Sequence, residues 1–282
     1  MSEIIPDGFV YANAASLASK IQDFKQAGPN QLQIVFDFDR TLTISKPGTN
    51  DEVTTWHILS DHLPQLGRDR YKELFQHYRS LEISGKMGTK DAVDWWSSIL
   101  DLFVEYHIDM SAVEEDFLSK ASIRPGTKEL FEFCSEYSVP TIILSAGIKD
   151  VIELWSQAYQ IKPTIILSTA LIKDTNNLVT GWDAQTLVHV LNKKEIGHPE
   201  LSKIRSERRN TILIGDSLAD ADMAEGTDNV IRIRLYDPRA DDGANMLARE
   251  QTLPLFDALI EDGRLDSIRR LARCIAGASS IL

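Results

Sequence analysis

Apolar residues recur every three or four positions between 14 and 24, a spacing that predicts an amphipathic helix. A Gly-Pro-Asn run at 28–30 ends this pattern. The next run, QLQIVF at 31–36, is short, apolar and rich in β-branched and aromatic residues, which predicts a buried strand that ends at Asp37. The N-terminal part of the chain is therefore expected to form one helix followed by one strand.

The pattern changes between residues 49 and 120. Trp, Leu, Tyr and Phe recur there at three- and four-residue intervals with charged residues between them, and the pattern contains no convincing strand. We predict a helical insertion of three to five helices in this region.

Strands and helices alternate again after Arg124. Predicted helices cover 125–137, 149–159 and 217–226, and predicted strands cover 139–145, 163–169, 210–216 and 229–235. Between the second and third of these strands the chain is less regular, and the tail is expected to hold two or three amphipathic helices, one of them at 265–277. The alternation predicts an α/β fold with a doubly wound parallel sheet, in which residues 1–48 and 121–282 form the core and residues 49–120 a helical cap.

Charge and composition narrow the range of partners. The net charge of −12 argues against a nucleic-acid-binding surface, which depends on clustered Lys and Arg. An anionic substrate would need a locally positive site made by a metal ion, a lysine or backbone amides. Cys134 and Cys274 lie in helical, apolar stretches without CxxC spacing, so we expect free thiols. The chain shows neither a secretory signal nor the roughly 20 apolar residues of a membrane span, so we expect a cytoplasmic protein without membrane contacts. No extra dimerisation segment is visible, so we expect a monomer.

Two carboxylates at the end of the first predicted strand are the first chemical signal. Asp37 and Asp39 are two residues apart, so in extended geometry they project to the same side. Such a close pair is costly unless a cation or a shared proton resolves the repulsion. Ligands of open α/β sheets bind outside the carboxyl ends of the strands, where this pair lies. A DxD pair alone is equally compatible with acidic caps of a helix or turn.

A second acidic group follows the predicted strand at 210–216. Gly215 allows close backbone approach, and Asp216 is expected to meet the same crevice as Asp37, with Asp220 just beyond. Carboxylate oxygens with open positions for water and phosphate suit Mg²⁺. The alternative is that these acids only favour a helix N-terminus, which is the interpretation preferred for Asp222.

Two further segments complete the candidate phosphate site. In the run IILSAG, Ser145 and the amides of Ala146 and Gly147 could hold a phosphate oxygen at the N-terminus of the next helix, although a serine in this position is also a common N-cap. Lys193 would pass for a surface lysine by itself. It matters because three aspartates and a phosphate dianion together need Mg²⁺, a lysine and backbone amides to balance their charge.

These segments resemble a known family. DFDRTLT (37–43), LSAG (144–147), NK (192–193) and GDSLADADMA (215–224) match the order and context of the four motifs of haloacid dehalogenase-like phosphatases. More narrowly, the chain resembles the type III cytosolic 5′-nucleotidases, also called pyrimidine 5′-nucleotidases, over roughly residues 31–235. TTWHILSD (54–61), HYRSLEIS (77–84), DWWSS (94–98), LSAGIKDVIE (144–153) and VLNKKEIG (190–197) carry this narrower likeness.

The resemblance implies a role for each motif residue. Asp37 would attack phosphorus and bind Mg²⁺, while Asp39 would protonate the leaving alcohol, then deprotonate water, and ligate the metal through its backbone carbonyl. Ser145 and Ala146 would hold phosphate oxygens and Lys193 would neutralise the transferring group. Asp216 would be the third metal ligand, and Asp220 would orient Lys193 or a metal-bound water. This division suits phosphoryl transfer, in which positioning and charge stabilisation supply most of the catalysis.

The cap would select the substrate. By the same resemblance, Glu82 corresponds to a glutamate that hydrogen-bonds the nucleobase, and Trp96 lies beside the base-stacking aromatic. For Trp95 and Trp96 the alternative is core packing on an amphipathic helix. The chain departs from the family pattern in two places: His57 replaces an asparagine, and SSIL at 97–100 replaces a TKSH-like run.

The leading hypothesis is therefore a magnesium-dependent hydrolase of a nucleoside 5′-monophosphate of the pyrimidine or 7-methylguanosine type, acting through an aspartyl-phosphate. The alternative within the superfamily is a phosphatase for a sugar phosphate, phosphoserine or cofactor phosphate. Transfer to an acceptor alcohol would be a variant of the same chemistry. A binding module without activity would be expected to lack Asp37, Asp39 or the Gly215-Asp216 pair, all of which are present.

Overall fold

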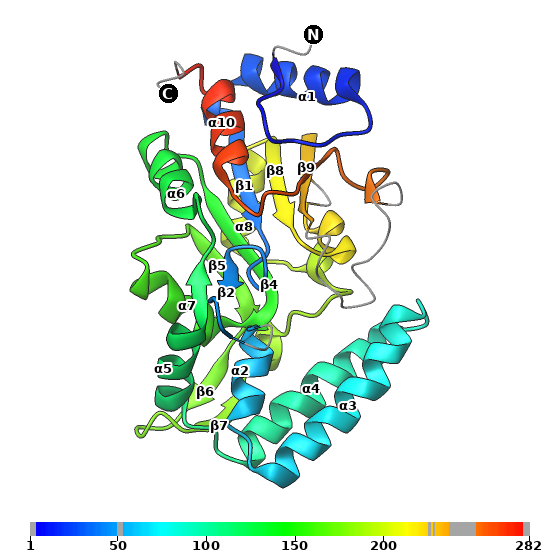
Figure 1. Ribbon diagram of the computed structural model, residues 1–282, viewed down its shortest axis with the longest axis vertical. Helices are drawn as coiled ribbons and strands as arrows, with labels where there is room; N and C mark the ends of the chain where they lie inside the picture. The colour runs from blue at the N-terminus through cyan, green and yellow to red at the C-terminus, as the bar shows by residue number, and fades with distance from the viewer. Residues whose placement is uncertain (1–3, 50–52, 225–226, 228, 237–251, 279–282) are drawn as a thin grey trace.

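A six-stranded parallel sheet forms the centre of the protein (Figure 1). The computed structural model describes residues 4–49, 53–224, 227, 229–236 and 252–278. Within them the strand order is β10-β9-β8-β1-β4-β5. The strands are β1 (Leu32–Phe36), β4 (Thr141–Ile148), β5 (Ile165–Thr169), β8 (Asn210–Gly215), β9 (Asn229–Leu235) and β10 (Ala258–Ile260). The predicted α/β fold with a parallel sheet is confirmed.

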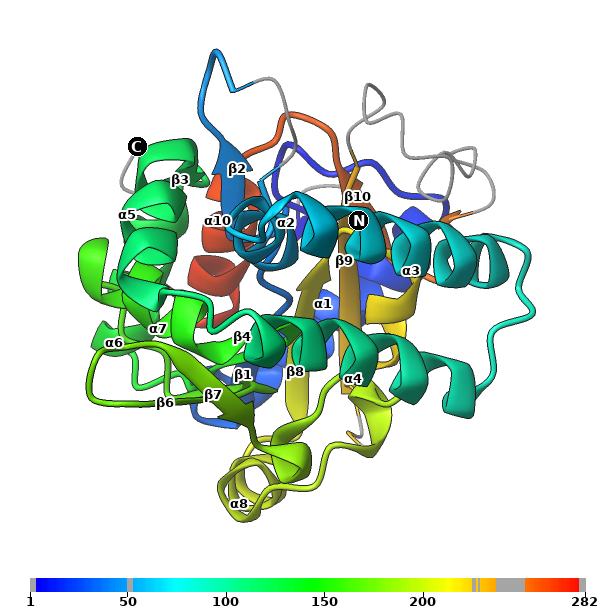
Figure 2. The ribbon, with the colours of Figure 1, turned by 90° about the horizontal axis from the view of Figure 1, so that it is seen from below.

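Helices cover both faces of this sheet, which is why the strands are apolar on both sides. On β1, Ile34 and Phe36 belong to one apolar cluster, whereas Val35 belongs to the other. The first cluster includes residues of α1 (Ala14–Ala27), α6 (Thr127–Glu136), α7 (Lys149–Ala158) and α10 (Asp266–Ile275). The second includes residues of α8 (Pro199–Glu207), which lies on the opposite side of the sheet from α10 (Figure 2). The sheet is therefore doubly wound, as predicted.

The predicted insertion contains four helices in its described residues, 53–120: α2 (Thr55–Asp61), α3 (Gln65–Ile83), α4 (Thr89–Glu105) and α5 (Met110–Lys120). A short antiparallel ladder of β2 (Thr43–Ser45) and β3 (Ala121–Ile123) joins its two ends. α3 and α4 run side by side and project from the core, whereas α5 packs against α7 (Figure 1). The boundaries of the cap at residues 49 and 120 stay a prediction.

Three elements differ from the sequence prediction. The expected helix at 217–226 is, in its described part, a 3₁₀ helix at Leu218–Asp222, because the Asp220 carboxylate folds back onto the amides at the start of the turn. The stretch expected to be irregular forms a hairpin of β6 (Leu171–Lys173) and β7 (Val179–Trp182). In the tail, α10 lies within the predicted helix, but β10 was not predicted, because a three-residue apolar segment carries no periodicity. Residues 237–251 lie outside the described part.

Two expectations about the chain can be compared with the structure. Both cysteines are free thiols, Cys134 buried and Cys274 half-buried, as predicted. Among the described residues, no helix is long and apolar enough to cross a membrane.

The side chain between the two aspartates anchors their turn in the core. Phe38 is fully buried, with its ring edge-on to Trp155 at 5.1 Å and stacked on Phe117 at 6.5 Å. We expect Phe38→Ala to lower the free energy of unfolding by about 3–5 kcal/mol, because truncation leaves a cavity that the neighbours fill only in part. Urea unfolding measures this. Ile172→Ala, at a half-exposed position, is the control and should change the value by no more than about 0.5 kcal/mol. Equal effects of the two substitutions would contradict this view of Phe38.

Candidate active site

Three neighbouring strands deliver the motif residues to one edge of the sheet. Asp37 directly follows β1, Asp216 directly follows β8, and Ser145 lies within β4. β1 lies between β8 and β4, with Phe36 opposite Ile214 on one side and Ile143 on the other. The carboxyl ends of parallel strands therefore bring together segments that are far apart in the sequence, as the alternating pattern predicted.

Lys193 joins the two acidic segments. It begins a 3₁₀ helix at Lys193–Glu195, and its Nζ donates to Asp37 Oδ1 and to Asp220 Oδ1, each at 2.7 Å. Its side chain is only 4% exposed. Burial alone would lower the pKa of Lys193, but attraction by Asp220 and Asp37 outweighs it and raises the pKa above its ordinary value. Lys193 is thus a buried cation rather than a surface lysine.

Negative charge still exceeds positive charge here. Asp37, Asp216 and Asp220 each offer a carboxylate oxygen, and these three oxygens lie within 4.8 Å of one another. Burial raises the pKa of Asp37 well above its usual range; Lys193 opposes this shift, whereas Asp220 and Asp216 add to it. A divalent cation bound to oxygen ligands would remove this repulsion.

The three acids are not equivalent as metal ligands. Both oxygens of Asp220 already accept hydrogen bonds, Oδ1 from Lys193 and Oδ2 from the amides of Asp216 and Ser217 at 3.1 and 2.9 Å. Asp220 is therefore built to hold the lysine and the turn, which leaves Asp37 and Asp216 as the carboxylates that fit Mg²⁺. Asp222 is exposed, in line with its expected non-catalytic role. The predicted metal bond of the Asp39 backbone carbonyl stays a prediction.

Asp39 belongs to a different network. Its Oδ1 accepts from the Thr55 amide at 2.9 Å and its Oδ2 from the Thr55 hydroxyl at 2.7 Å, while that hydroxyl accepts from the Ile148 amide at 3.2 Å. Burial raises the pKa of Asp39 to about 6, against the lowering effect of the Thr55 hydrogen bonds. Sequence reasoning missed Thr55. Its signals were its place in TTWHILSD (54–61), one of the segments that resemble the family, and its place at the start of the first insertion helix, where side-chain and amide donors gather.

The segment 145–147, which was predicted to hold a phosphate oxygen at a helix N-terminus, has a different local structure. Ser145, Ala146 and Gly147 do not open a helix: β4 continues to Ile148, with a register shift against β5 between Leu144 and Ile148, and α7 begins only at Lys149. The segment is an irregular strand end, which re-aims side chains and amides as a bulge does. The Gly147 amide donates to Ser145 Oγ at 3.0 Å, and Ser145 is 1% exposed.

Two glycines permit the close approach of these segments. A Cβ on Gly215 would lie 2.4 Å from the Asp220 side chain, and one on Gly147 would lie 2.5 Å from Thr55 Oγ1 and 3.0 Å from Asp39 Oδ2. Real Cβ atoms do not approach other atoms so closely, so both positions require glycine for steric reasons.

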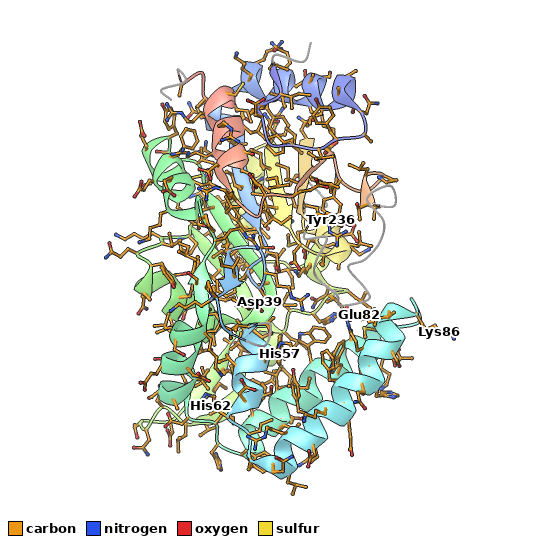
Figure 3. All side chains as sticks on the ribbon, viewed as in Figure 1. Asp39, His57, His62, Glu82, Lys86 and Tyr236 are labelled. Atoms are coloured by element: carbon orange, nitrogen blue, oxygen red, sulfur yellow. The ribbon has the colours of Figure 1, made fainter. Side chains whose placement is uncertain are left out.

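One cavity of about 780 Å³ joins this acidic cluster to the insertion. Asp37, Asp39, Ser145, Lys193 and Asp216 line one part of it, and Tyr71, Phe75, Trp95, Trp96 and Ile99 line another. Figure 3 shows Asp39, His57 and Glu82 around the space between the core and the α3–α4 pair.

The residues expected to select the base lie on this cavity. Glu82, on α3, lines it and forms an ion pair with Arg79. Trp96 lines it too, although its ring is only 8% exposed and its indole N–H donates to the Ala146 carbonyl oxygen. His57 lines the cavity with its Nδ1 3.0 Å from Thr54 Oγ1. From SSIL at 97–100, only Ile99 reaches the cavity.

Comparisons with known proteins agree with this geometry. The model of the family "Pyrimidine 5'-nucleotidase (UMPH-1)" matches residues 42–276. The chain is 32% identical over 276 residues to the 7-methylguanosine phosphate-specific 5'-nucleotidase A of Xenopus laevis, with 92% of each chain covered. It is 26% identical to the human 7-methylguanosine phosphate-specific 5'-nucleotidase, with 89% of this chain and 87% of the human protein covered.

Solved structures share the fold. A crystal structure of cytosolic 5'-nucleotidase IIIB bound to cytidine matches with a TM-score of 0.80 and 23% identity, covering 98% of this chain and 96% of the other. A substrate-bound phosphoserine phosphatase matches with a TM-score of 0.58 and 16% identity, covering 86% and 97%. The predicted likeness to 5'-nucleotidases and to phosphatases of this fold is confirmed.

The raised pKa of Asp39 predicts a pH-dependent cost of folding. Because its folded pKa of about 6 lies above the ordinary 3.8, the folded state binds this proton more tightly, so the cost is absent near pH 4 and complete above pH 6. In metal-free protein, we expect Asp39→Asn to raise the free energy of unfolding at pH 7.5 by on the order of 1–2 kcal/mol, allowing for the partial solvent contact of the carboxylate.

Urea unfolding with EDTA at pH 4.5 and pH 7.5 measures this difference, which should fall to about a third at the lower pH. Asp23→Asn, an exposed position on α1, is the control for losing a negative charge. A gain that is the same at both pH values would refute the raised pKa.

Proposed function

The chain belongs to the pyrimidine 5'-nucleotidase (UMPH-1) family, and on that premise we propose that it hydrolyses a nucleoside 5′-monophosphate of the pyrimidine or 7-methylguanosine type to nucleoside and phosphate. The reaction depends on Mg²⁺ and passes through an aspartyl-phosphate on Asp37. The coarser prediction, an enzyme that hydrolyses phosphoric monoesters, is confirmed by its relatives, which are named 5'-nucleotidases.

One observation carries the proposal: the cavity that contains Asp37, Asp216 and Lys193 continues to an aromatic wall on α3 and α4. Its volume of about 780 Å³ lies within the roughly 300–1,000 Å³ typical of ligand sites. A phosphate at the acidic end leaves room for a sugar and a base toward the aromatic end. A nucleotide therefore suits both the chemistry and the shape of the site.

Each residue of the acidic end has a separate task. An Asp37 oxygen attacks phosphorus, and the bond from phosphorus to the ester oxygen breaks as Asp39 gives that oxygen its proton. Asp39, now ionised, takes a proton from water, which attacks the aspartyl-phosphate and releases phosphate and free Asp37. A pKa of about 6 suits a group that must act as acid and then as base near neutral pH.

Several fixed groups balance the negative charge of the phosphoryl group and of the aspartates. Lys193 lies against Asp37 and neutralises the phosphoryl oxygens nearby, while Asp220 fixes the lysine. Asp37, Asp216 and the Asp39 carbonyl would hold Mg²⁺, which supplies positive charge to the transferring phosphoryl group. Ser145 and the Ala146 amide would bind phosphate oxygens.

The far end of the cavity favours a base with positive character. Methylation at N7 gives guanine a positive charge, and such a base gains from stacking on a tryptophan face and from a nearby carboxylate. Trp96 and Glu82 offer these groups on neighbouring helices. The names of the Xenopus laevis and human relatives favour 7-methylguanosine monophosphate in the same way.

Small esters such as phosphoserine or a sugar phosphate are the alternative substrates. The similarity to phosphoserine phosphatase concerns the fold alone, and such a ligand would leave the aromatic end of the cavity empty.

We also propose a monomer that does not bind nucleic acid. A cytoplasmic location is supported by a Caenorhabditis elegans relative named as a putative cytosolic 5'-nucleotidase, 23% identical.

Phosphate release from a panel of esters tests the function. We expect the purified protein to hydrolyse 7-methyl-GMP, CMP and UMP in preference to AMP, GMP, phosphoserine and hexose phosphates, and only with Mg²⁺. Asp37→Asn should lower kcat by at least about 10³-fold, because the nucleophile is lost while the fold is kept. Release from non-nucleotide esters alone would keep the chemistry and reject the nucleotide assignment, and release that survives in Asp37→Asn would reject the mechanism.

Glu82→Gln tests base selection. Loss of the carboxylate charge should raise KM for 7-methyl-GMP about tenfold, as expected for a charged hydrogen bond, with little change in kcat. KM for p-nitrophenyl phosphate, which has no base, should stay the same. Glu105→Gln is the matched control, because that glutamate pairs with Arg70 and does not line the cavity. A uniform loss across all esters would show that Glu82 does not read the base.

A further inference from the structure

Two tryptophans of the insertion donate to the same carbonyl oxygen in the core. Trp56 Nε1 lies 2.9 Å and Trp96 Nε1 lies 3.1 Å from the oxygen of Ala146. The donors come from different helices, α2 and α4, and their rings meet edge-on at a centroid distance of 6.1 Å. Ala146 lies in the irregular end of β4 that borders Asp37 in the cavity.

We propose that Trp56 and Trp96 are positioning residues for phosphate binding: their indole N–H groups fix the Ala146–Gly147 peptide and thereby orient the Ser145 hydroxyl toward the phosphoryl group. The inference rests on the proposed function, because it assigns phosphate binding to this loop. It goes beyond that function by giving both tryptophans a part in holding the phosphate, in addition to the place of Trp96 beside the base.

The peptide between Ala146 and Gly147 is held on both of its sides. Its oxygen accepts the two indole N–H groups, and its own N–H donates to Ser145 Oγ at 3.0 Å. Since the Ser145 oxygen accepts there, the hydroxyl hydrogen must point elsewhere, and Ser145 lines the cavity. Two hydrogen bonds on a carbonyl also polarise the peptide, which strengthens its N–H as a donor.

Burial of the indoles does not by itself require this arrangement. Trp95 and Trp155 are buried as well, and within the described part of the chain their Nε1 atoms have no hydrogen-bond partner. The fold thus tolerates unpaired indoles elsewhere, yet directs two onto a single oxygen beside Asp37. This convergence points to a need for the oxygen to be held.

Because both tryptophans also line the cavity, they connect its two ends. Correct placement of the insertion then becomes a condition for a well-formed phosphate site. Removing either indole N–H should weaken binding of a bare phosphate ion, although that ion contacts neither ring.

Calorimetric titration with inorganic phosphate in the presence of Mg²⁺ tests this without turnover. We expect Trp56→Phe and Trp96→Phe each to raise the Kd for phosphate about three- to tenfold, and the double variant to raise it further, as for the loss of one and two hydrogen bonds. kcat/KM for p-nitrophenyl phosphate should fall in parallel. Trp182→Phe is the control, since it removes an indole N–H that donates to Asp101 and that tryptophan does not line the cavity.

A second replacement separates the hydrogen bond from the ring. Benzothienylalanine at position 56 or 96 keeps the bicyclic shape but puts sulfur in place of N–H, so it should weaken phosphate binding as Phe does, with unfolding by urea unchanged. Normal phosphate affinity with benzothienylalanine, or an equal loss in Trp182→Phe, would overturn the proposal. Wild-type protein that binds phosphate but hydrolyses no nucleotide would reject the proposed function and leave this test valid, whereas wild-type protein that binds no phosphate would reject both.

Discussion

Crowding of negative charge at the carboxyl edge of the sheet is the constraint on which the rest of the structure depends. Three carboxylate oxygens lie within 4.8 Å of one another, and a single buried lysine touches two of the three acids. Like charges about 4 Å apart repel by roughly 4 kcal/mol even at an effective dielectric constant of 20. Lys193 and two amides satisfy Asp220, and an Arg40 nitrogen lies 3.9 Å from an Asp216 oxygen, so a bound cation would act mainly on Asp37 and Asp216.

The surrounding loops are shaped to permit that crowding. Gly215 lets Asp220 lie directly over the backbone, and Gly147 lets β4 pass against Thr55 and Asp39. After Asp39 the chain turns through Arg40 in a left-handed conformation, with φ 62°, which an L-residue rarely adopts without support. Arg124 provides it by donating to the carbonyl oxygens of Arg40 and Thr41. The two hydrogen bonds from Arg124 thus hold the backbone of the turn that follows Asp39.

The sequence predicts what depends on local pattern and fails where distant contacts decide. The apolar, β-branched composition of 31–36 predicts a buried strand. Because ligands of parallel sheets bind at the carboxyl ends of the strands, the sequence then predicts that Asp37 and Asp216 lie close together. Local propensity could not show that Asp220 would fold back and turn the segment at 217–226 into a 3₁₀ helix. Nor could it show that Ser145 would lie in an irregular strand end instead of a helix N-terminus. Thr55 and the two indole donors lie in segments that resemble the family, but no local pattern shows what they bind, because their partners lie 16 to 93 residues away.

In the proposed reaction, the insertion contributes to proton transfer as well as to the choice of base. Asp39 belongs to the core, yet both of its oxygens are bound by Thr55, the first residue of α2. Its pKa of about 6 arises from burial, against which the Thr55 hydrogen bonds lower it, whereas a solvent-exposed aspartate titrates near 3.9. At that value the carboxyl group would be almost fully ionised at neutral pH and could not protonate a leaving oxygen. The first helix of the insertion thus fixes the position of the Asp39 carboxyl group, so in the proposed reaction proton transfer as well as substrate selection depends on the insertion.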